Sequence, residues 1–202
     1  HDDVRLRVGS VEPRSLDPEF VKVMTESEGR VCRHLHLPLQ SGSDKVLHEM
    51  NRPYSAHEFL EVVAMLKRQV GDISLTTDVI VGFPGETEQD FADTCTLVRE
   101  VGFTKIHVFR YSRREGTPAA SRTDQIPAET KERRAHELSV LGDRLRIQYA
   151  QRRIGSHELV AVEQEGWGMT ESYYKVRVDG FPQGALVDVC LTGVDDAAIM
   201  RA

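Results

Sequence analysis

Polar and aromatic side chains recur at every second position in three apolar segments, and they are the first candidates for chemistry. They are His34, His36 and Gln40 in the first segment, Ser74, Thr76 and Asp78 in the second, and His107, Phe109 and Tyr111 in the third. Because alternate residues of a strand share one face, each segment predicts a strand with one apolar and one polar face. A packed barrel interior is usually lined by Val, Ile and Leu. The pattern therefore favours a wider barrel that holds a polar ligand, and the alternative is that these groups bond only to one another.

Two loops follow the first two segments, at the carboxyl ends of the strands, where functional residues are expected. Residues 39–43 offer hydroxyls and backbone donors at the start of a helix, which suits a ribose or a carboxylate. Residues 78–87 contain two glycines around Pro84, so the backbone there can approach a ligand closely. Glu86 stands where the dipole of the next helix favours a negative charge. The Ser-Gly-Ser run alone is more often a simple cap and turn, whereas the second motif is long and unusual.

The elements that must position these loops alternate between strand and helix patterns. Strand-like runs occupy residues 4–8, 33–37, 73–81 and 105–109. Helix starts are predicted at Pro18, Ser43, Ser55 and Thr87. Strands that alternate with helices predict parallel βαβ units, and four such units are too few to close an eight-stranded barrel. The predicted fold class is therefore α/β, with a partial parallel (β/α) barrel.

The pattern changes after a long helical stretch that begins at Pro127 and ends at Gly155. The remaining residues form short alternating runs between glycine, aspartate and proline turns, which is typical of a small all-β barrel. We therefore expect two domains. Residues 1–154 would hold the partial barrel with its linking helix, and residues 155–202 a small β domain.

Composition excludes several classes of protein. Hydrophobic residues make up 40% and charged residues 29% of the chain, and no apolar run approaches the ~20 residues of a membrane span. We therefore expect a cytoplasmic protein without a membrane segment. Cys32, Cys95 and Cys190 show neither a disulfide framework nor a CxxC metal motif, so reduced thiols are expected. The net charge is −6, but eight bases face five acids between Arg122 and Arg153, so basic surface survives locally.

Three longer motifs bear a resemblance to one family. HLHLPLQSGSDKVLHEMNRPYS, TTDVIVGFPGETEQDF and HVFRYSRREGTPAA are similar to motifs of the radical-SAM methylthiotransferases, and the terminal β region resembles their TRAM RNA-binding module. The resemblance implies that the four predicted strands are the third to sixth of a six-stranded partial barrel. It also implies a preceding Cys-x-x-x-Cys-x-x-Cys motif, which this sequence lacks. That difference, and the abrupt start at His1, indicate a fragment.

Within that family, residues 10–13 and 168–173 most resemble the branch that acts on N6-threonylcarbamoyladenosine beside the tRNA anticodon. Branches that act on isopentenyladenosine in tRNA, or on a ribosomal protein, are the alternatives. The resemblance implies S-adenosylmethionine and two [4Fe–4S] clusters as cofactors of the parent enzyme, and the tRNA anticodon stem-loop as its partner. Because the cluster cysteines are missing, we expect this chain alone to be inactive and to bind neither cofactor tightly.

The resemblance also implies candidate site residues. Those that would line the S-adenosylmethionine site are Ser10, Glu12, Gln40, Ser41 and Ser43 at the barrel mouth, Asp78, Gly82, Pro84, Gly85 and Glu86 on the next wall, and Phe109, Tyr111 and Ser112 on the last strand. Candidates for RNA contact are Arg52, Arg113, Arg114, Arg133 and Arg134. Core packing of Phe109 and Tyr111, and solvated arginines without a ligand, are the alternatives. No catalytic residue and no metal ligand is assigned.

Two other functional classes remain open. A free-standing RNA-binding module would need only the basic helix and the terminal β domain, although eight acids against three bases after Gly155 count against strong electrostatic binding. A phosphate-binding α/β-barrel enzyme would need an acid–base pair, for which only Asp78 and Glu86 offer themselves. Because the first strands of the implied barrel are missing from this sequence, residues 4–8 are expected to be an unprotected sheet edge through which the chain self-associates.

Overall fold

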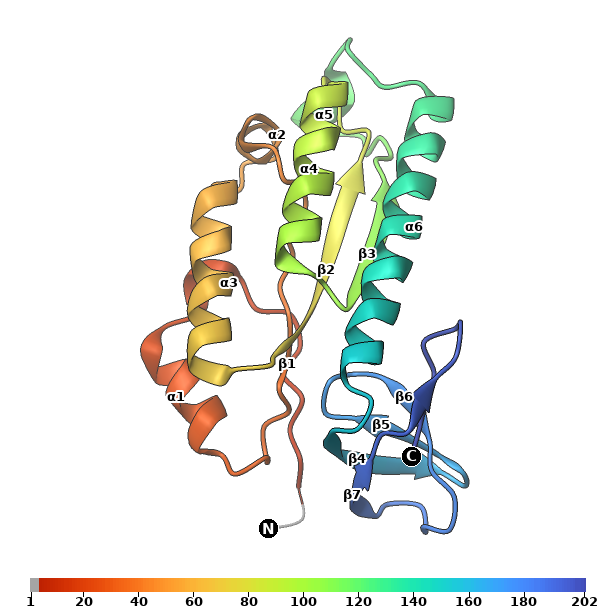
Figure 1. Ribbon diagram of the computed structural model, residues 1–202. Helices are drawn as coiled ribbons and strands as arrows, with labels where there is room; N and C mark the ends of the chain where they lie inside the picture. Colours follow the sequence, from red (N-terminus) through yellow and green to blue (C-terminus); the bar gives the residue numbers. More distant parts are fainter. Residues whose placement is uncertain (1–3) are drawn as a thin grey trace.

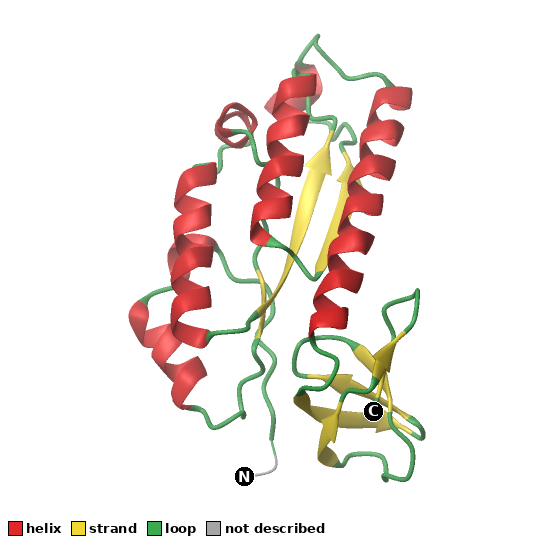
Figure 2. Cartoon of the chain, in the orientation of Figure 1, coloured by secondary structure: helices red, strands yellow, loops and turns green. Residues whose placement is uncertain are grey.

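The first part of the molecule is a parallel three-stranded sheet with helices on one face (Figure 1, Figure 2). A computed structural model describes residues 4–202, and the start at His1 lies outside this range. The strands are β1 (His34–His36), β2 (Ser74–Val81) and β3 (Lys105–Arg110), in the order β1-β2-β3. The helices are α1 (Pro18–Glu26), α2 (Asp44–Glu49), α3 (Ala56–Val70), α4 (Glu88–Val101), α5 (Pro118–Ser121) and α6 (Ala128–Arg152), with a 3-10 turn, η1 (Pro13–Ser15). The predicted alternation of strand and helix is confirmed for these three strands.

Capping residues start the helices where the sequence predicts. Ser55 caps α3, and the Glu58 side chain accepts in return from the Ser55 amide. Thr87 and Asp90 form the same reciprocal pair at the start of α4, and Gly102 ends that helix with a φ of 70°. Each cap satisfies amides that have no partner inside the helix, and replacing one by alanine typically costs ~1 kcal/mol.

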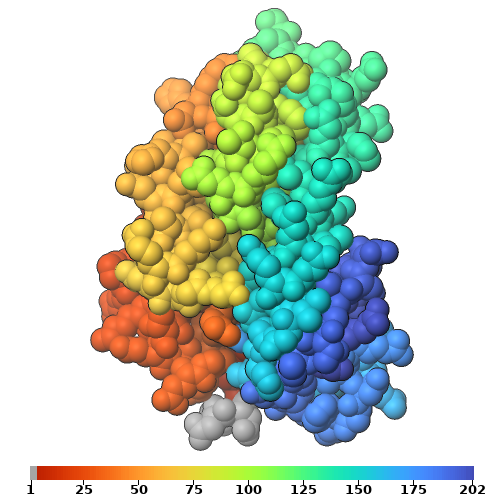
Figure 3. Space-filling view, viewed as in Figure 1, coloured from red at the N-terminus to blue at the C-terminus, as the bar shows by residue number. Residues whose placement is uncertain are grey.

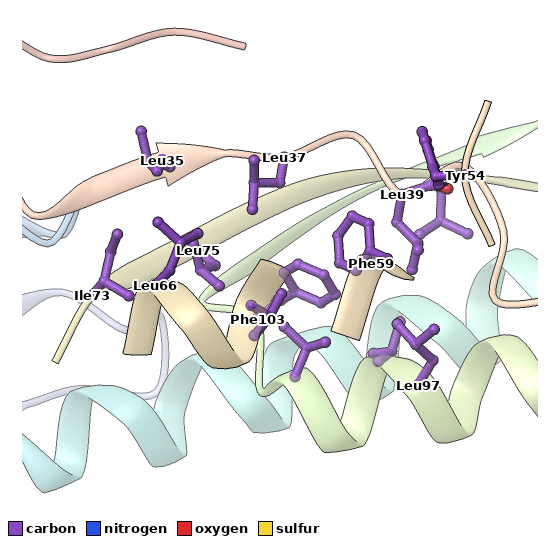
Figure 4. Close-up of a cluster of buried hydrophobic side chains, with 14 of the residues drawn as sticks. Leu35, Leu37, Leu39, Tyr54, Phe59, Leu66, Ile73, Leu75, Leu97 and Phe103 are labelled. Carbon is purple, nitrogen blue, oxygen red and sulfur yellow. Dashed lines mark hydrogen bonds between the residues drawn. The ribbon is translucent and has the colours of Figure 1, made fainter. Parts of the chain in front are cut away.

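The apolar face of the sheet packs against the helices. Leu35, Leu37 and Leu39 are fully buried in the same core as Phe59 and Phe103 (Figure 4). The surrounding helices supply Val21, Leu47, Leu66, Leu97 and Leu138. Burying one such side chain contributes about 1.5–3 kcal/mol. Since alternate strand residues take opposite faces, this packing directs the polar residues to the other face of the sheet.

Residues 4–8 form only an isolated parallel bridge, from Leu6 to Val31, where a full strand is predicted. The Leu6 amide and carbonyl make the two backbone bonds of this bridge, at 2.7 and 2.9 Å. The ladder stays this short because the partner segment before β1 turns irregularly. Val4 and Leu6 are 51% and 57% exposed, and an unprotected sheet edge at this segment stays a prediction.

The second part is a curled sheet of short strands that follows α6. The strands are β4 (His157–Gln164), β5 (Trp167–Thr170), β6 (Lys175–Arg177), β7 (Leu186–Cys190), β8 (Gly193–Val194) and β9 (Met200–Arg201), in the order β7-β4-β5-β6-β9-β8. Val160, Tyr174, Val176 and Met200 belong to its own core. The predicted alternating runs correspond to β4, β6, β7 and β9, whereas β5 and β8 are not predicted because their segments show no clear alternation.

Helix α6 spans 25 residues and takes part in both cores. Leu138 belongs to the first core, and Tyr149 and Ala150 belong to the second. In the space-filling view, the blue C-terminal residues pack against the lower end of this helix (Figure 3). Neither α6 nor any other helix within residues 4–202 has the length and apolarity needed to cross a membrane.

Charged groups also join the two parts. Glu171, in the loop after β5, accepts hydrogen bonds from Arg33 at 2.8 Å and from Arg5 at 3.3 Å. Arg153, just after α6, is paired with Asp72 beside β2. These contacts position the loop after β5 next to the polar face of the first sheet.

Candidate functional site

The polar face of the first sheet carries a continuous chain of hydrogen-bonding side chains. Thr76 Oγ1 on β2 lies 3.1 Å from His34 Nε2 and 3.0 Å from His36 Nδ1, both on β1. His36 Nε2 in turn lies 3.4 Å from Asp78 Oδ2. The register explains this chain, because His36 is the cross-strand partner of Thr76 and His107 is that of Asp78. The predicted gathering of polar groups on this face is confirmed.

A cavity of about 460 Å³, which we call the inner cavity, lies over these side chains. Its lining consists of Arg7, Val8, Gly9, Ser10, His34, His36, Thr76, Asp78, His107, Phe109 and Tyr173. Tyr173 comes from the second part, and its ring centroid lies 4.7 Å from that of His34. The Arg7 guanidinium lies 4.9 Å from the centre of the Tyr173 ring and donates to the Thr170 carbonyl at 2.7 Å. The inner cavity is therefore lined by both parts of the molecule and is open to solvent.

A second cavity, the loop cavity, has a volume of about 490 Å³. Its lining consists of Gln40, Asp78, Ile80, Phe83, Phe109, Arg110, Tyr111, Ser112, Arg114, Thr117 and Ala119. Asp78 and Phe109 line both cavities, so the two are neighbours along the polar face. The Tyr111 hydroxyl is buried and has no hydrogen-bond partner among the described residues. An unpaired buried hydroxyl costs about 1–3 kcal/mol, so a ligand that bonds to it would gain affinity.

Two histidines of the inner cavity, His34 and His107, have lowered pKa values. Burial, together with the charges of Arg7 and His36, lowers the pKa of His34 to about 3. Burial and the nearby Lys105 also lower the pKa of His107. A neutral imidazole keeps one nitrogen lone pair that can accept a hydrogen bond or bind a metal ion. Near neutral pH, these rings therefore offer acceptor atoms instead of positive charge.

Several residues predicted for the cofactor site do line a cavity. Ser10 borders the inner cavity, while Gln40, Tyr111 and Ser112 border the loop cavity. Phe109 is 52% exposed, which excludes the alternative that it is a core residue. The structure thus brings these residues together, and their role in binding stays a prediction.

Ser41 and Ser43 line neither cavity, which corrects their predicted placement. The Ser41 hydroxyl is buried 3.3 Å from Thr94 Oγ1, and the Ser43 hydroxyl donates to Asp90 Oδ1 at 2.7 Å. Both contacts hold the loop after β1 against α4. The cap-and-turn alternative for this Ser-Gly-Ser run is the one that the structure supports.

The glycine–proline loop is held together by its own contacts, and of residues 82–87 only Phe83 lines a cavity, the loop cavity. Glu86 is 3% exposed and accepts from the Gly82 amide at 2.6 Å and from the Arg134 guanidinium at 2.5 Å. Burial raises the pKa of Glu86, while the Gly82 amide and Arg134 act to lower it. Pro84 and Gly85 complete this turn and are absent from both linings as well.

These contacts correct two further predictions. Arg134 is 2% exposed and paired with Glu86, so it cannot reach an RNA phosphate from the surface. Glu86 is likewise committed to this pair and does not meet Asp78 in a cavity, which leaves the alternative α/β-barrel enzyme without its acid–base pair. The helix pattern showed Arg134 as an ordinary charged position, but this face of α6 packs against the start of α4.

The other arginines predicted to contact RNA differ in their exposure and in whether a carboxylate already binds them. Arg113 and Arg114 are exposed, and Arg114 borders the loop cavity. Arg133 is engaged by two carboxylates at 2.7 and 2.8 Å. Arg52 pairs with Glu12 at 3.5 Å. Glu12, predicted for the cofactor site, is exposed and lines neither cavity.

The site also contains residues that the sequence analysis did not single out, among them Arg7, Phe83 and Tyr173. Thr76 and His107, which the two-residue alternation did single out, line the inner cavity as well. Tyr173 gave no such signal, because it reaches the inner cavity only through the docking of the second part.

Comparison with known proteins decides the family. Residues 3–98 match the profile of the Radical SAM superfamily. A tRNA-2-methylthio-N(6)-dimethylallyladenosine synthase of Caldicellulosiruptor saccharolyticus is 43% identical over 151 residues, which are 75% of this chain and 32% of that protein. A threonylcarbamoyladenosine tRNA methylthiotransferase of Bacillus subtilis is 38% identical over 185 residues, covering 87% of this chain and 41% of that protein. The chain belongs to the radical SAM methylthiotransferase family.

A solved radical SAM enzyme shares the fold. Coproporphyrinogen III oxidase from Escherichia coli is similar with a TM-score of 0.57 at 20% identity, over 72% of this chain and 33% of that one. This likeness supports a mixed α/β radical SAM fold built on a parallel sheet. The chain spans 32% and 41% of the length of the two methylthiotransferases named above.

The radical SAM family uses S-adenosylmethionine and [4Fe–4S] clusters, and the described residues fit these two groups differently. Cys32 precedes β1, Cys95 lies on α4 and Cys190 on β7, and no three cysteines come together within residues 4–202. A [4Fe–4S] cluster needs thiolates around one centre, so these cysteines do not fit it. The loop cavity does fit a nucleoside, because it combines aromatic rings with polar groups and lies within the usual range of about 300–1,000 Å³.

Proposed function

We propose that the full-length protein installs a methylthio group on N6-threonylcarbamoyladenosine beside the tRNA anticodon. Membership of the radical SAM methylthiotransferase family supports the class of reaction. The motifs at residues 10–13 and 168–173 support this substrate. This chain alone is not expected to catalyse the reaction, because its cysteines lie on separate elements.

The observation that carries the proposal is the meeting of two cavities at Asp78 and Phe109. We assign the loop cavity to the adenosine of S-adenosylmethionine, with Gln40, Tyr111 and Ser112 as hydrogen-bond partners. We assign the inner cavity to the substituent on N6 of the target adenosine. Two reactants that share a wall are held close together, and such positioning accounts for a large part of enzymatic rate enhancement.

Arg7 favours the threonylcarbamoyl substituent over an apolar one. That substituent ends in a carboxylate, and a guanidinium can bind a carboxylate through two parallel hydrogen bonds. Arg7 lines the inner cavity and is held by the carbonyls of Thr170 and Glu171, at 2.7 and 3.1 Å. A dimethylallyl group in the same place would leave this guanidinium without an anionic partner.

S-adenosylmethionine, when bound, supplies the radical chemistry of the family. In this proposal, the described residues bind S-adenosylmethionine and the target adenosine and orient them toward each other. The exposed Phe109 ring offers a surface on which a base can stack, a contact worth about 1–3 kcal/mol in single-strand recognition. His36 Nδ1 lies 3.0 Å from Thr76 Oγ1 and Nε2 lies 3.4 Å from Asp78 Oδ2, so neighbouring side chains fix the orientation of this ring.

We propose that the exposed Arg113 and Arg114 contact the tRNA backbone, and that the second part is a TRAM-like barrel that assists them. In this proposal the bridge of residues 4–8 and strands β1, β2 and β3 are the third to sixth strands of a six-stranded partial barrel. The protein would act in the cytoplasm on the tRNA anticodon stem-loop.

The substrate can be tested by expressing the full-length protein in a bacterial strain that lacks methylthiotransferases, followed by mass spectrometry of tRNA nucleosides. The expected product is the 2-methylthio form of N6-threonylcarbamoyladenosine. Arg7→Ala should strongly reduce this product, whereas Arg144→Ala, at an exposed position of α6, should not. Absence of any methylthio product would overturn the proposed reaction.

A second candidate is the reaction on dimethylallyladenosine. It is favoured by the higher identity, 43% against 38%, of the relative named for that nucleoside. The same experiment separates the two, because a methylthio group found only on dimethylallyladenosine would replace the first substrate by the second. Binding of an anticodon stem-loop without any product would instead favour a non-catalytic RNA-binding module.

A further inference from the structure

His36, Asp78 and His107 bring three metal-ligating atoms together on the polar face of the sheet. These atoms, two imidazole nitrogens and one carboxylate oxygen, all lie within 4.8 Å of one another. Within residues 4–202, no other three His, Cys, Asp or Glu side chains meet in this way. We propose that they form a binding site for a divalent first-row transition metal ion in the wall of the inner cavity.

The sheet itself sets the spacing of the three ligands. His107 on β3 is the cross-strand partner of Asp78 on β2. His36 on β1 is paired with Thr76, two residues before Asp78 and so on the same face. His36 Nε2 and Asp78 Oδ2 lie 3.4 Å apart. Two atoms that each lie about 2.1 Å from one tetrahedral ion are separated by roughly 3.4 Å, so this pair already has the required spacing.

Thr76 orients the His36 ring for such a role. Its Oγ1 lies 3.0 Å from His36 Nδ1, so donation of the Nδ1 proton to Thr76 leaves the Nε2 lone pair directed toward Asp78. The Thr76 hydroxyl can in turn donate a hydrogen bond to His34 Nε2, which lies 3.1 Å away. Metal-ligating histidines regularly donate their second ring N–H to an oxygen, which fixes the tautomer. The site therefore has three ligands and also a side chain, Thr76, that holds the ligating His36 ring in place.

His34 provides an independent observation. This ring is 3% exposed and lines the inner cavity, and its Nδ1 has no hydrogen-bond partner among the described residues. An unpaired buried polar group costs about 1–3 kcal/mol. The described residues therefore leave one buried polar atom beside the three ligands unsatisfied.

The ligand set selects the class of ion. Two imidazoles and a carboxylate suit Zn²⁺, Fe²⁺ and Co²⁺, whereas Mg²⁺ and Ca²⁺ prefer sets of oxygen ligands. Three protein ligands beside a cavity of about 460 Å³ leave coordination positions for water or a substrate oxygen, as in catalytic sites. The His36 and Asp78 side chains are 15% and 30% exposed, so an ion can reach them. The site does not depend on the proposed methylthiotransferase reaction.

Titration of the untagged 202-residue chain with Co²⁺ tests the site, because Co²⁺ held by nitrogen and oxygen ligands absorbs visible light. We expect one ion per chain, displaced by Zn²⁺ but not by Mg²⁺. His36→Asn, Asp78→Asn and His107→Asn should each weaken binding at least about tenfold. His157→Asn is the matched control, because His157 also contacts a carboxylate, that of Asp188 at 2.9 Å, but on the exposed surface.

Two further measurements separate binding from folding. Thr76→Val keeps all three ligands but removes the hydroxyl that holds the His36 ring in place, and should weaken Co²⁺ binding by about tenfold or more. Zn²⁺ should raise the Tm of the wild type and of His157→Asn but not that of His107→Asn, with circular dichroism reporting that each variant is folded. The proposal is overturned if the folded wild-type chain binds no Co²⁺, or if binding survives the loss of either His36 or His107.

Discussion

The Ser43 hydroxyl donates to Asp90 Oδ1 at 2.7 Å and ties the loop after β1 to the first turn of α4. The second oxygen of Asp90 accepts from the Thr87 amide at 2.8 Å and from Lys45 at 3.0 Å. One carboxylate therefore holds the helix cap and the loop that precedes α2. Because Gln40 lies in that loop, the shape of the loop cavity depends on this contact.

Replacing Asp90 by Asn should destabilise the protein in a pH-dependent way. Burial acts to raise the pKa of Asp90, but bonds from Ser43, Thr87 and Lys45 outweigh it and hold that pKa below its usual range. A lowered folded-state pKa stabilises above the unfolded value of 3.8, and the benefit is lost as the pH falls from there toward the folded-state pKa. We expect Asp90→Asn to reduce the free energy of unfolding by about 1–3 kcal/mol at pH 7, less below pH ~4. Urea unfolding at several pH values measures both effects, and a loss that is the same at every pH would contradict this account.

Removing Arg134 should be among the most damaging changes in α6. Arg134→Met leaves the buried Glu86 carboxylate with only the Gly82 amide, and breaking a buried ion pair typically costs about 3–5 kcal/mol. Arg133→Met is the matched control, because that neighbouring arginine is exposed to solvent and paired at the surface. Chemical denaturation compares the two variants. Equal stabilities would show that Glu86 and Arg134 do not form the pair described here.

Gly42 has no room for a side chain. A Cβ at this position would lie 2.5 Å from Thr94 Cα, which is backbone of α4 and cannot move aside cheaply. Gly42→Ala should therefore cost about 1–3 kcal/mol, the usual range for overpacking. Gly9→Ala is the control, because nothing lies within 4 Å of its added Cβ. A Gly42→Ala variant as stable as the wild type in thermal unfolding would mean that the loop and α4 pack less closely.

Glu171 should matter for the docking of the two parts. Glu171→Gln replaces the carboxylate that Arg5 and Arg33 share, and a charged hydrogen bond of this kind is worth about 1.5–3 kcal/mol. A protease should cut the Glu171→Gln variant faster than the wild type at the segment that follows α6. Glu165→Gln, which changes an exposed turn residue, should be cut at the wild-type rate. Unchanged cleavage would indicate that the parts are joined by apolar packing alone.

The open edge beside β1 predicts self-association at high concentration. Leu6 is 57% exposed and lies on a segment with backbone bonds to only one neighbour, and such edges pair readily with another chain. Leu6→Lys should reduce the average mass measured by light scattering, because a charge blocks strand pairing. A wild-type chain that stays monomeric at high concentration would exclude this mode of association.

The polar face and the helix starts could be predicted because both are encoded locally. Alternation with period two follows from strand geometry alone, so His36, Thr76 and Asp78 had to share a face once Leu35 and Leu37 were buried. The capping residue Ser55 needed only Glu58, three positions away. Strand alternation and helix capping depend only on neighbouring residues, so they can be predicted without knowledge of the tertiary structure.

The remaining parts of the site depend on contacts between distant segments. Arg134 resembled any charged residue on an amphipathic helix, and its partner Glu86 is 48 positions away. Ser41 and Ser43 were predicted for the cofactor site, with a cap and turn as the alternative, but their hydroxyls bond to side chains of α4. Tyr173 reaches His34 only because the two parts dock, which no local pattern reports.

The participation of α6 in both cores has a mechanical consequence. Leu138 is embedded in one hydrophobic centre, and Tyr149 in the other stacks on Tyr174 with ring centroids 5.8 Å apart. Tilting α6 would strain both cores at once, so a force applied to the C-terminal sheet is transmitted through this helix to β3, against which it packs.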